Sequence, residues 1–252
     1  RLLLRQVGLL VVSSPGFLKH YYVPAQGYRG PHFVLENKLY PPERSATATD
    51  VPAGPVVDRG RYRWVVGCFG LIRGQTTFDL ITRLAERLSD EVLFYFRGVV
   101  TTVDPATFAE TVARHDNMVY GGPYVNPDDL AGLYGAVDLV WTLDLEHEDA
   151  NSRWLMPCRF YEAGAYGVPC LAARHFEVGD RVEALGIGWT FEAPYEDAIA
   201  RFFAGLDRAA YDRVRARLAG LPRATFIAGD DVAALCRLLG TGPHMLAEPA
   251  MG

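Results

Sequence analysis

The sequence predicts an α/β protein built on a parallel sheet with helices on both faces. From Trp64 onward, short apolar segments alternate with longer segments whose apolar residues recur close to the helical period. The short segments are mostly apolar, and residues 170–173 are apolar along their whole length. Such runs are typical of strands buried on both sides of a parallel sheet. Strict alternation with helices of this length places those helices on both faces of the sheet.

The first 40 residues are predicted to form a small strand-helix-strand unit that is separate from the main domain. An apolar run at residues 7–13 predicts a strand, and the following Ser-Ser-Pro predicts a short helix ending near residue 22, with serine as its cap. Residues 32–35 predict a second strand. Because a helix joins these two strands, we expect residues 1–40 to be the last strand-helix-strand piece of a preceding domain.

Residues 41–61 are rich in Pro, Thr, Ala and Asp without a hydrophobic period, so we interpret them as a linker. Residues 62–240 form the predicted main domain, and residues 241–252 are interpreted as a loose tail. The strands expected in the main domain cover residues 63–69, 92–96, 118–120, 137–142, 170–173 and 189–191. The expected helices cover residues 76–88, 105–115, 127–134, 195–206, 211–218 and 231–239, with a further helix directly after Pro157.

Composition excludes several classes of function. The chain has 252 residues, half of them hydrophobic, and a net charge of −5 without a lysine- or arginine-rich block. A sizeable core is therefore expected, and nucleic acid is not an expected partner. No apolar run reaches the roughly 18–20 residues of a membrane span, and no signal peptide is recognisable.

The four cysteines are scattered and form no C-x-x-C pair, so we interpret them as buried free thiols in a reducing, cytoplasmic compartment. The chain begins at Arg1 in what reads as the middle of a helix. We therefore expect it to be a piece of a longer protein.

Residues 157–170 carry the strongest functional signal. The expected helix presents Arg159 and Glu162 three positions apart, on one face near its N-terminal end. Free backbone amides around Cys158, together with a guanidinium, can bind a diphosphate. A carboxylate one turn later can accept hydrogen bonds from ribose hydroxyls. This combination predicts a nucleotide-sugar site.

The order P-x-R-x-x-E-x-x-x-x-G-x-P in this segment resembles the donor-binding motif of retaining glycosyltransferases with the GT-B fold (group 1, family 4). The resemblance implies that residues 62–240 are the Rossmann-like donor domain of such an enzyme and that residues 1–40 end its N-terminal Rossmann-like domain. Much of that family has a first Glu eight positions before the second, where this chain has Trp154. The resemblance is to a branch in which Asn151 or another loop group contacts the sugar instead.

A second candidate loop, residues 69–77, follows the first strand of the main domain. Gly70 and Gly74 let backbone amides approach an anion, and Arg73 can pair with a phosphate. In the resembled family this loop holds the donor diphosphate. A plain turn with a solvated Arg73 is the alternative.

A third candidate loop is residues 120–125. In the resembled family it presents backbone groups to the nucleobase, which implies roles for Gly122 and for Tyr124 as a stacking side chain. A simple turn with Tyr124 in the core is the alternative. The resemblance also places residues 176–180 in a loop close to the sugar.

A metal site is not expected. The acidic segment 144–149 contains a single histidine, whereas a metal centre built on it would need a second anchored ligand of that kind. Asp144 lies at the end of a predicted strand, and the alternative to metal binding is that its side chain faces the sugar. The resemblance likewise implies that protein cations and helix dipoles stabilise the leaving diphosphate without a metal or other cofactor.

The resulting hypothesis is retaining transfer of a hexose from a UDP- or GDP-linked donor to an alcohol, as in polysaccharide biosynthesis. Arg73 and Arg159 neutralise the leaving diphosphate and Glu162 fixes the ribose. The acceptor, a glycan or a lipid-linked glycan at the inner face of the membrane, binds mainly to the N-terminal domain. We therefore expect this chain to bind donor without completing transfer.

Two alternatives keep the same architecture. One is a degenerate nucleotide-sugar-binding module, suggested by Trp154, and the other is a UDP-sugar epimerase, for which no carboxylate-histidine pair is evident. An oxidoreductase is disfavoured because the G-x-G-x-x-G fingerprint is absent.

Overall fold

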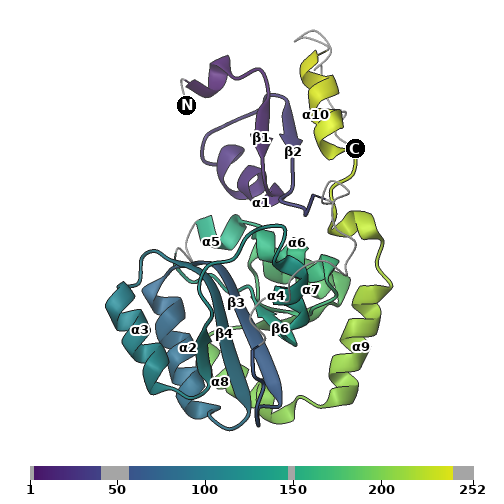
Figure 1. Ribbon diagram of the computed structural model, residues 1–252. Coiled ribbons are helices and arrows are strands. Elements are labelled where there is room, and N and C mark those ends of the chain that lie inside the picture. The colour runs from purple at the N-terminus through teal and green to yellow at the C-terminus, as the bar shows by residue number, and fades with distance from the viewer. Residues whose placement is uncertain (1–2, 41–56, 147–150, 241–252) are drawn as a thin grey trace.

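The computed structural model describes residues 3–40, 57–146 and 151–240, and its main feature is a six-stranded, fully parallel sheet (Figure 1). The strands follow the order β5-β4-β3-β6-β7-β8 across this sheet. Their bounds are β3 (Trp64–Ile72), β4 (Val92–Val100), β5 (Met118–Tyr120), β6 (Leu139–Trp141), β7 (Cys170–Ala173) and β8 (Gly188–Phe191). The predicted fold class is confirmed.

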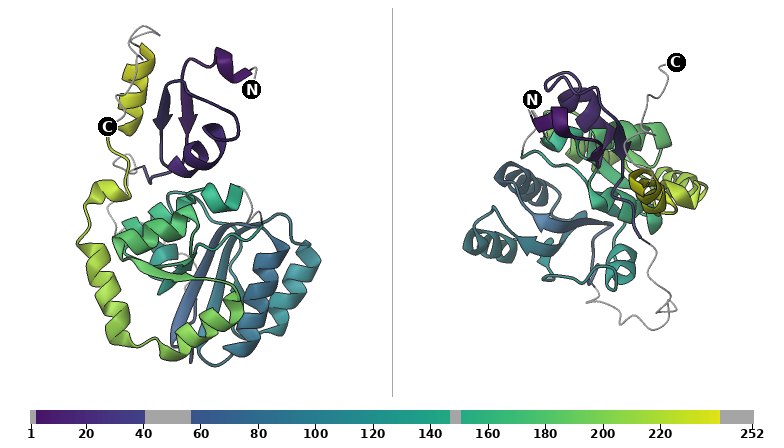
Figure 2. Two further views of the ribbon diagram at one scale, coloured as in Figure 1. Left: turned by 180° about the vertical axis from the view of Figure 1, so that it is seen from behind. Right: turned by 90° about the horizontal axis from the view of Figure 1, so that it is seen from above.

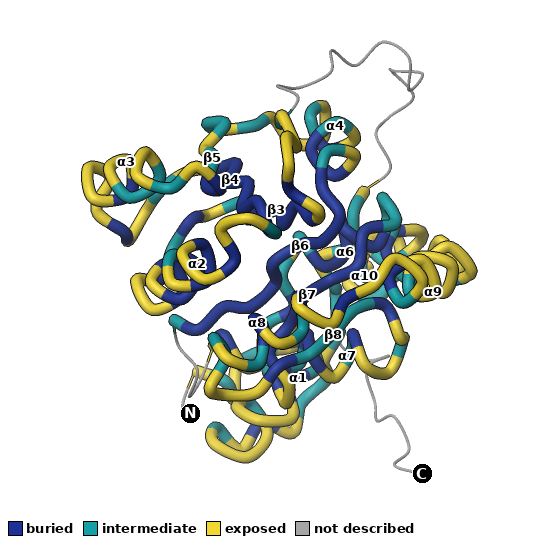
Figure 3. The backbone as a smooth tube through the Cα atoms, turned by 90° about the horizontal axis from the view of Figure 1, so that it is seen from below, coloured by how far each residue is buried: buried dark blue, intermediate teal, exposed yellow. Residues whose placement is uncertain are grey.

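The order of strands reverses between β3 and β6. Strands β4 and β5 extend the sheet to one side of β3, whereas β6, β7 and β8 extend it to the other. The helices are α2 (Gln75–Arg87), α3 (Pro105–Arg114), α4 (Leu130–Gly135), α5 (Asn151–Trp154), α6 (Cys158–Ala165), α7 (Glu177–Leu185), α8 (Tyr195–Gly205), α9 (Arg208–Ala219) and α10 (Asp231–Gly240). Figure 3 shows α2 and α8 on one face and α4 and α6 on the other. Ligands of open parallel sheets bind beyond the carboxyl ends of the strands at such a reversal.

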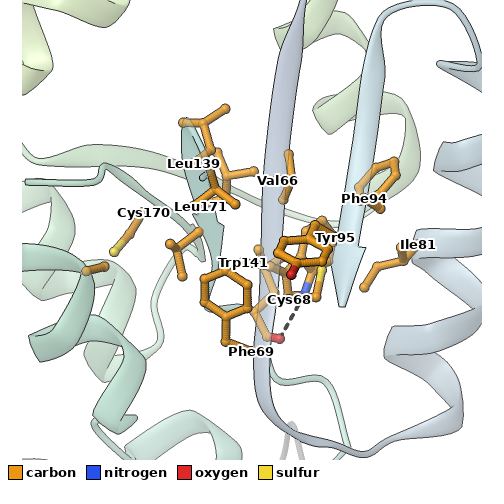
Figure 4. Close-up of a cluster of buried hydrophobic side chains, with 14 of the residues drawn as sticks. Val66, Cys68, Phe69, Ile81, Phe94, Tyr95, Leu139, Trp141, Cys170 and Leu171 are labelled. Carbon is orange, nitrogen blue, oxygen red and sulfur yellow. Dashed lines mark hydrogen bonds between the residues drawn. The ribbon is translucent and has the colours of Figure 1, made fainter. Parts of the chain in front are cut away.

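The core lies between the central strands and the helices that cover them. Side chains from β3, β4 and β6 alternate through it, and Val66, Phe94 and Leu139 are fully buried (Figure 4). Strand β3 pairs with β4 over its whole length but with β6 only at Val66 and Gly67. The outer parts of β3 and β4 therefore continue as a two-stranded ribbon beyond the rest of the sheet.

This ribbon corrects the expected loop at residues 69–77. The strand was expected to end at Phe69, but β3 and β4 stay in register to the pair Ile72–Val100. Gly70 and Gly98 face each other in the ribbon with φ angles of 95° and 134°, a region that favours glycine. A Cβ on Gly98 would lie 1.8 Å from the Gly70 carbonyl oxygen. Gly70 therefore belongs to a strand.

The N-terminal unit contains a parallel pair of short strands, β1 (Leu10–Val12) and β2 (His32–Val34). Helix α1 (Pro15–Phe17) is capped by Ser14, whose side chain accepts a hydrogen bond from the Gly16 amide, and a π-helical turn continues to Tyr22. A short 3₁₀ helix precedes β1. The elements agree with a strand-helix-strand piece, whereas its assignment to a preceding domain stays a prediction.

The N-terminal unit lies over the carboxyl edge of the large sheet, beside α10 (Figures 1 and 2). Asn37 donates a hydrogen bond to the Met156 carbonyl at 3.1 Å. Glu36 accepts one from the Tyr161 hydroxyl at 3.1 Å and pairs with Arg181 at 2.7 Å. These contacts reach the segment before α6, α6 itself and α7, so they fix the unit above the predicted site.

Two further expectations need correction, and a third agrees with the structure. Residues 177–180 begin helix α7, because the preceding apolar strand is followed directly by a helical segment packed on β7 and β8. Two of the cysteines are exposed: Cys158 is the first residue of α6 and lines the cleft described below, and Cys236 lies on α10, none of whose residues is buried; Cys68 and Cys170 are buried. Within the described ranges, none of the helices has the length and apolar character needed to cross a membrane.

Candidate functional site

A cleft of about 500 Å³ lies between the N-terminal unit and the carboxyl edge of the sheet. The N-terminal unit contributes Ser13, Phe17 and Asn37 to its wall. Seven of the eight residues predicted for the site line the same cleft: Gly70, Arg73, Tyr124, Asn151, Cys158, Arg159 and Glu162. The eighth, Gly122, does not line it.

Arg159 enters the cleft from the first turn of α6. Its guanidinium donates a hydrogen bond to the Phe69 carbonyl at 3.2 Å, which ties it to the central strand β3. Its Nε atom is buried and has no hydrogen-bond partner in the described structure. A buried N–H without a partner costs roughly 1–3 kcal/mol, so an acceptor that reached this atom would be stabilised by it.

Glu162 lies one turn further along α6 and is only 5% exposed. One carboxylate oxygen accepts a hydrogen bond from the Asn126 side chain at 3.0 Å, and the other accepts one from the Tyr134 hydroxyl at 2.6 Å. Burial raises the pKa of Glu162, while these hydrogen bonds and the charge of Arg159 oppose the rise. The carboxylate is thus held in one orientation, and its remaining lone pairs are able to accept from a ligand hydroxyl.

Arg73 carries a resident counter-ion. Its guanidinium contacts the Asp144 carboxylate at 2.6 Å, while 37% of its own side-chain surface stays exposed. The other oxygen of Asp144 accepts a hydrogen bond from the Ser152 hydroxyl at 2.9 Å. Burial acts to raise the pKa of Asp144, but the hydrogen bonds from Arg73 and Ser152 outweigh it and hold this pKa below its ordinary value. Asp144, the alternative sugar contact, is therefore engaged with protein groups.

The loop at residues 120–125 is held by the buried side chain of Arg97, a residue that the sequence analysis did not predict for the site. Arg97 in β4 is 5% exposed and donates to the Gly122 carbonyl at 3.0 Å and the Pro123 carbonyl at 2.8 Å. It also donates to the Tyr95 hydroxyl at 3.1 Å. An arginine inside an otherwise apolar strand is the signal that could have found it, because buried charges need partners.

Tyr124 follows this turn, is half-buried, and both lines the cleft and packs against the edge of the core. Its hydroxyl would lie 3.9 Å from a Cβ placed on Gly70, so the two residues are neighbours on the cleft wall. Burial and the nearby charge of Glu162 raise the pKa of Tyr124 to about 12. The ring is therefore a neutral wall at ordinary pH.

Asn151 is exposed at the start of α5, on the cleft. Trp154, at the end of α5, packs instead against aromatic side chains of the N-terminal unit. No cluster of His, Cys, Asp and Glu suited to a metal occurs among the described residues. Residues 147–150 of the acidic segment lie outside them.

Comparison with known proteins relates this architecture to enzymes that transfer sugars. The chain is 29% identical over 235 residues to the succinoglycan biosynthesis protein ExoL of Rhizobium meliloti (strain 1021), covering 92% of this chain and 58% of ExoL. No family model matches the sequence.

Solved structures share the fold at low sequence identity. HepE from Anabaena, in complex with UDP and glucose, has a TM-score of 0.66 at 16% identity, covering 94% of this chain and 64% of HepE. The catalytic domain of starch synthase IV from Arabidopsis thaliana, bound to ADP and acarbose, has a TM-score of 0.63 at 15% identity, covering 96% and 57%. WaaG, a glycosyltransferase involved in lipopolysaccharide biosynthesis, has a TM-score of 0.55 at 14% identity, covering 95% and 63%.

These likenesses identify the fold as that of GT-B glycosyltransferases. The chain spans less than two thirds of the length of ExoL and of each of these structures.

Proposed function

We propose that the cleft binds the diphosphate of a nucleotide sugar and that the chain supplies the donor side of a glycosyltransferase. The observation that carries the proposal is the buried, unpartnered Nε of Arg159 on a cleft that also receives Arg73. Two guanidinium groups and one unsatisfied donor call for an anionic ligand with several acceptor oxygens.

Each residue has a defined part in this proposal. Arg159 and Arg73 offset the negative charge that builds on the diphosphate as the bond to the sugar breaks. The amides at the start of α6, next to Cys158, add the positive end of a helix dipole. Glu162, oriented by Tyr134 and Asn126, accepts hydrogen bonds from the ribose and so positions the donor.

The comparisons support the class of reaction. HepE and starch synthase IV hold a nucleoside diphosphate together with a sugar or sugar analogue, and ExoL serves succinoglycan biosynthesis. We therefore propose a UDP- or GDP-linked hexose donor, transfer with retention and without a metal, and a glycan or lipid-linked glycan as acceptor. The remaining part of a longer protein would supply most of the acceptor site.

Calorimetric titration with UDP, GDP, ADP and dTDP, in the presence of EDTA, tests the donor site. One nucleotide should bind clearly best. The change Arg159→Met keeps the length of the side chain and removes its donors, so affinity should fall about 30- to 1,000-fold. Arg114→Met, on the exposed surface of α3, is the matched control and should bind as wild type. No binding by wild type, or equal binding by Arg159→Met, refutes the proposal.

A degenerate module that binds nucleotide sugar without transferring it is the second candidate, favoured by Trp154 at the position of the family's first Glu. Both candidates predict the same binding. Transfer or hydrolysis of the donor by the full-length protein separates them, because only an enzyme releases free nucleotide.

A further inference from the structure

Trp154 joins helix α5 to the N-terminal unit. Its ring stacks on His20 with centroids 6.3 Å apart and on Tyr21 at 6.0 Å, and it meets Phe17 edge-on at 6.4 Å. Aromatic contacts of this kind contribute about 0.5–1.5 kcal/mol each beyond the area they bury. Trp154 is therefore the main side-chain anchor between α5 and the segment that follows β1.

The backbone of Trp154 is fixed by the same segment. The Ser14 hydroxyl donates a hydrogen bond to the Trp154 carbonyl at 2.6 Å. A Cβ on Gly16 would lie 2.8 Å from that carbonyl oxygen, so only glycine allows α1 to approach this closely. Both ends of the contact, ring and backbone, depend on residues 14–21.

Two residues before Trp154, the buried Ser152 points toward the sheet. Its hydroxyl donates to one oxygen of Asp144 at 2.9 Å, and the other oxygen of Asp144 holds Arg73 at 2.6 Å. Among the described residues, Asp144 is the one that accepts a hydrogen bond from the Arg73 side chain. An uninterrupted series of contacts thus leads from the N-terminal unit, through the single turn of α5, to a guanidinium on the cleft.

We infer that Ser152 is a positioning residue for Arg73, and that Trp154 makes this position depend on the docking of residues 14–21. The inference rests on the proposed function, in which Arg73 binds the diphosphate. Without the Ser152 hydroxyl, the same Asp144 oxygen keeps only the longer hydrogen bond from the Glu146 amide, at 3.3 Å, so Asp144 and with it Arg73 are held less firmly. Without the Trp154 ring, α5 loses its anchor and Ser152 is displaced.

The test compares a ligand that reaches Arg73 with one that does not. We would use the nucleoside diphosphate that binds best among UDP, GDP, ADP and dTDP, and its nucleoside, which lacks phosphate. Ser152→Ala and Trp154→Ala should each weaken the diphosphate about 3- to 30-fold, the range of coupling through a packed network. Both should leave nucleoside affinity, measured by ligand-observed NMR, unchanged. Trp154→Phe keeps an aromatic anchor and should lose less.

Two matched variants separate positioning from general loosening. Thr82→Val removes a hydroxyl bonded to a helix carbonyl, and Trp189→Ala removes a ring packed on Phe202, both away from the cleft. Neither should alter diphosphate affinity, even where the melting temperature falls.

The outcomes are distinct. Wild-type affinity in Ser152→Ala, or equal loss of diphosphate and nucleoside, overturns the role of Ser152. Wild-type diphosphate affinity in Trp154→Ala would show that the position of Arg73 does not depend on the docking of residues 14–21. If wild type binds none of the four nucleotides, the proposed function itself fails.

Discussion

Replacing Glu162 with alanine should destabilise the domain because the buried Tyr134 hydroxyl loses its hydrogen-bond acceptor. In the structure, the Tyr134 hydroxyl is buried and donates to Glu162 at 2.6 Å, whereas Asn126 is exposed and can turn to water. Removal of the carboxylate therefore leaves one buried donor without a partner. That costs about 1–3 kcal/mol, and at 2–4 °C per kcal/mol the melting temperature should fall by about 2–12 °C.

The origin of the loss is tested by a second substitution. Tyr134→Phe removes the stranded hydroxyl, so the double variant Glu162→Ala/Tyr134→Phe should be more stable than Glu162→Ala alone. Urea unfolding of wild type, both single variants and the double variant completes the cycle. Glu110→Ala, at an exposed position on α3, is the control and should match wild type. Wild-type stability in Glu162→Ala, or no recovery in the double variant, would show that the hydroxyl is not what the carboxylate satisfies.

Three further predictions follow from individual side chains. Cys158 lines the cleft and Cys236 lies exposed on α10. Bound nucleotide should therefore slow the alkylation of Cys158 but not of Cys236, as measured by mass spectrometry. Equal protection of both cysteines would contradict nucleotide binding in this cleft. Folding raises the pKa of Glu162, so ionisation of this carboxyl opposes folding. Wild type should therefore lose stability as the pH rises from about 4.3 through the folded pKa. Glu162→Gln should lose less between pH 4 and pH 7, as measured by urea unfolding. Gly98→Ala should cost more than about 2 kcal/mol, since its Cβ would meet the neighbouring strand at 1.8 Å, whereas Gly135→Ala, with open space around it, should cost nothing.

Residues close in sequence were the predictable part of this site. The spacing of Arg159 and Glu162 places them on one face of α6 because a helix has 3.6 residues per turn, and both do line the cleft. The parallel sheet was predictable for a similar reason, since continuous apolar runs alternating with helices admit few other arrangements.

Pairings across long stretches of chain were not predictable. Arg73 and Asp144 are 71 positions apart, and nothing local in either segment indicates that they meet. The ribbon formed by the ends of β3 and β4 was missed because Gly70 reads as a turn, whereas its positive φ is used inside a strand opposite Gly98. Trp154 was interpreted only as a missing glutamate, because its aromatic partners come from a separate unit of the chain.

Under the proposed function, the Arg73–Asp144 pair has a consequence for the release of the nucleotide product. In the proposed function, an incoming diphosphate shares Arg73 with a carboxylate that is already bound to it, so the attraction for the nucleotide is weaker than two free guanidinium groups would give. The same carboxylate reclaims Arg73 when the nucleotide departs, which lowers the barrier to its release. An enzyme built this way should suffer little product inhibition, and neutralising the carboxylate by Asp144→Asn should make the nucleoside diphosphate a stronger competitor of its own sugar conjugate.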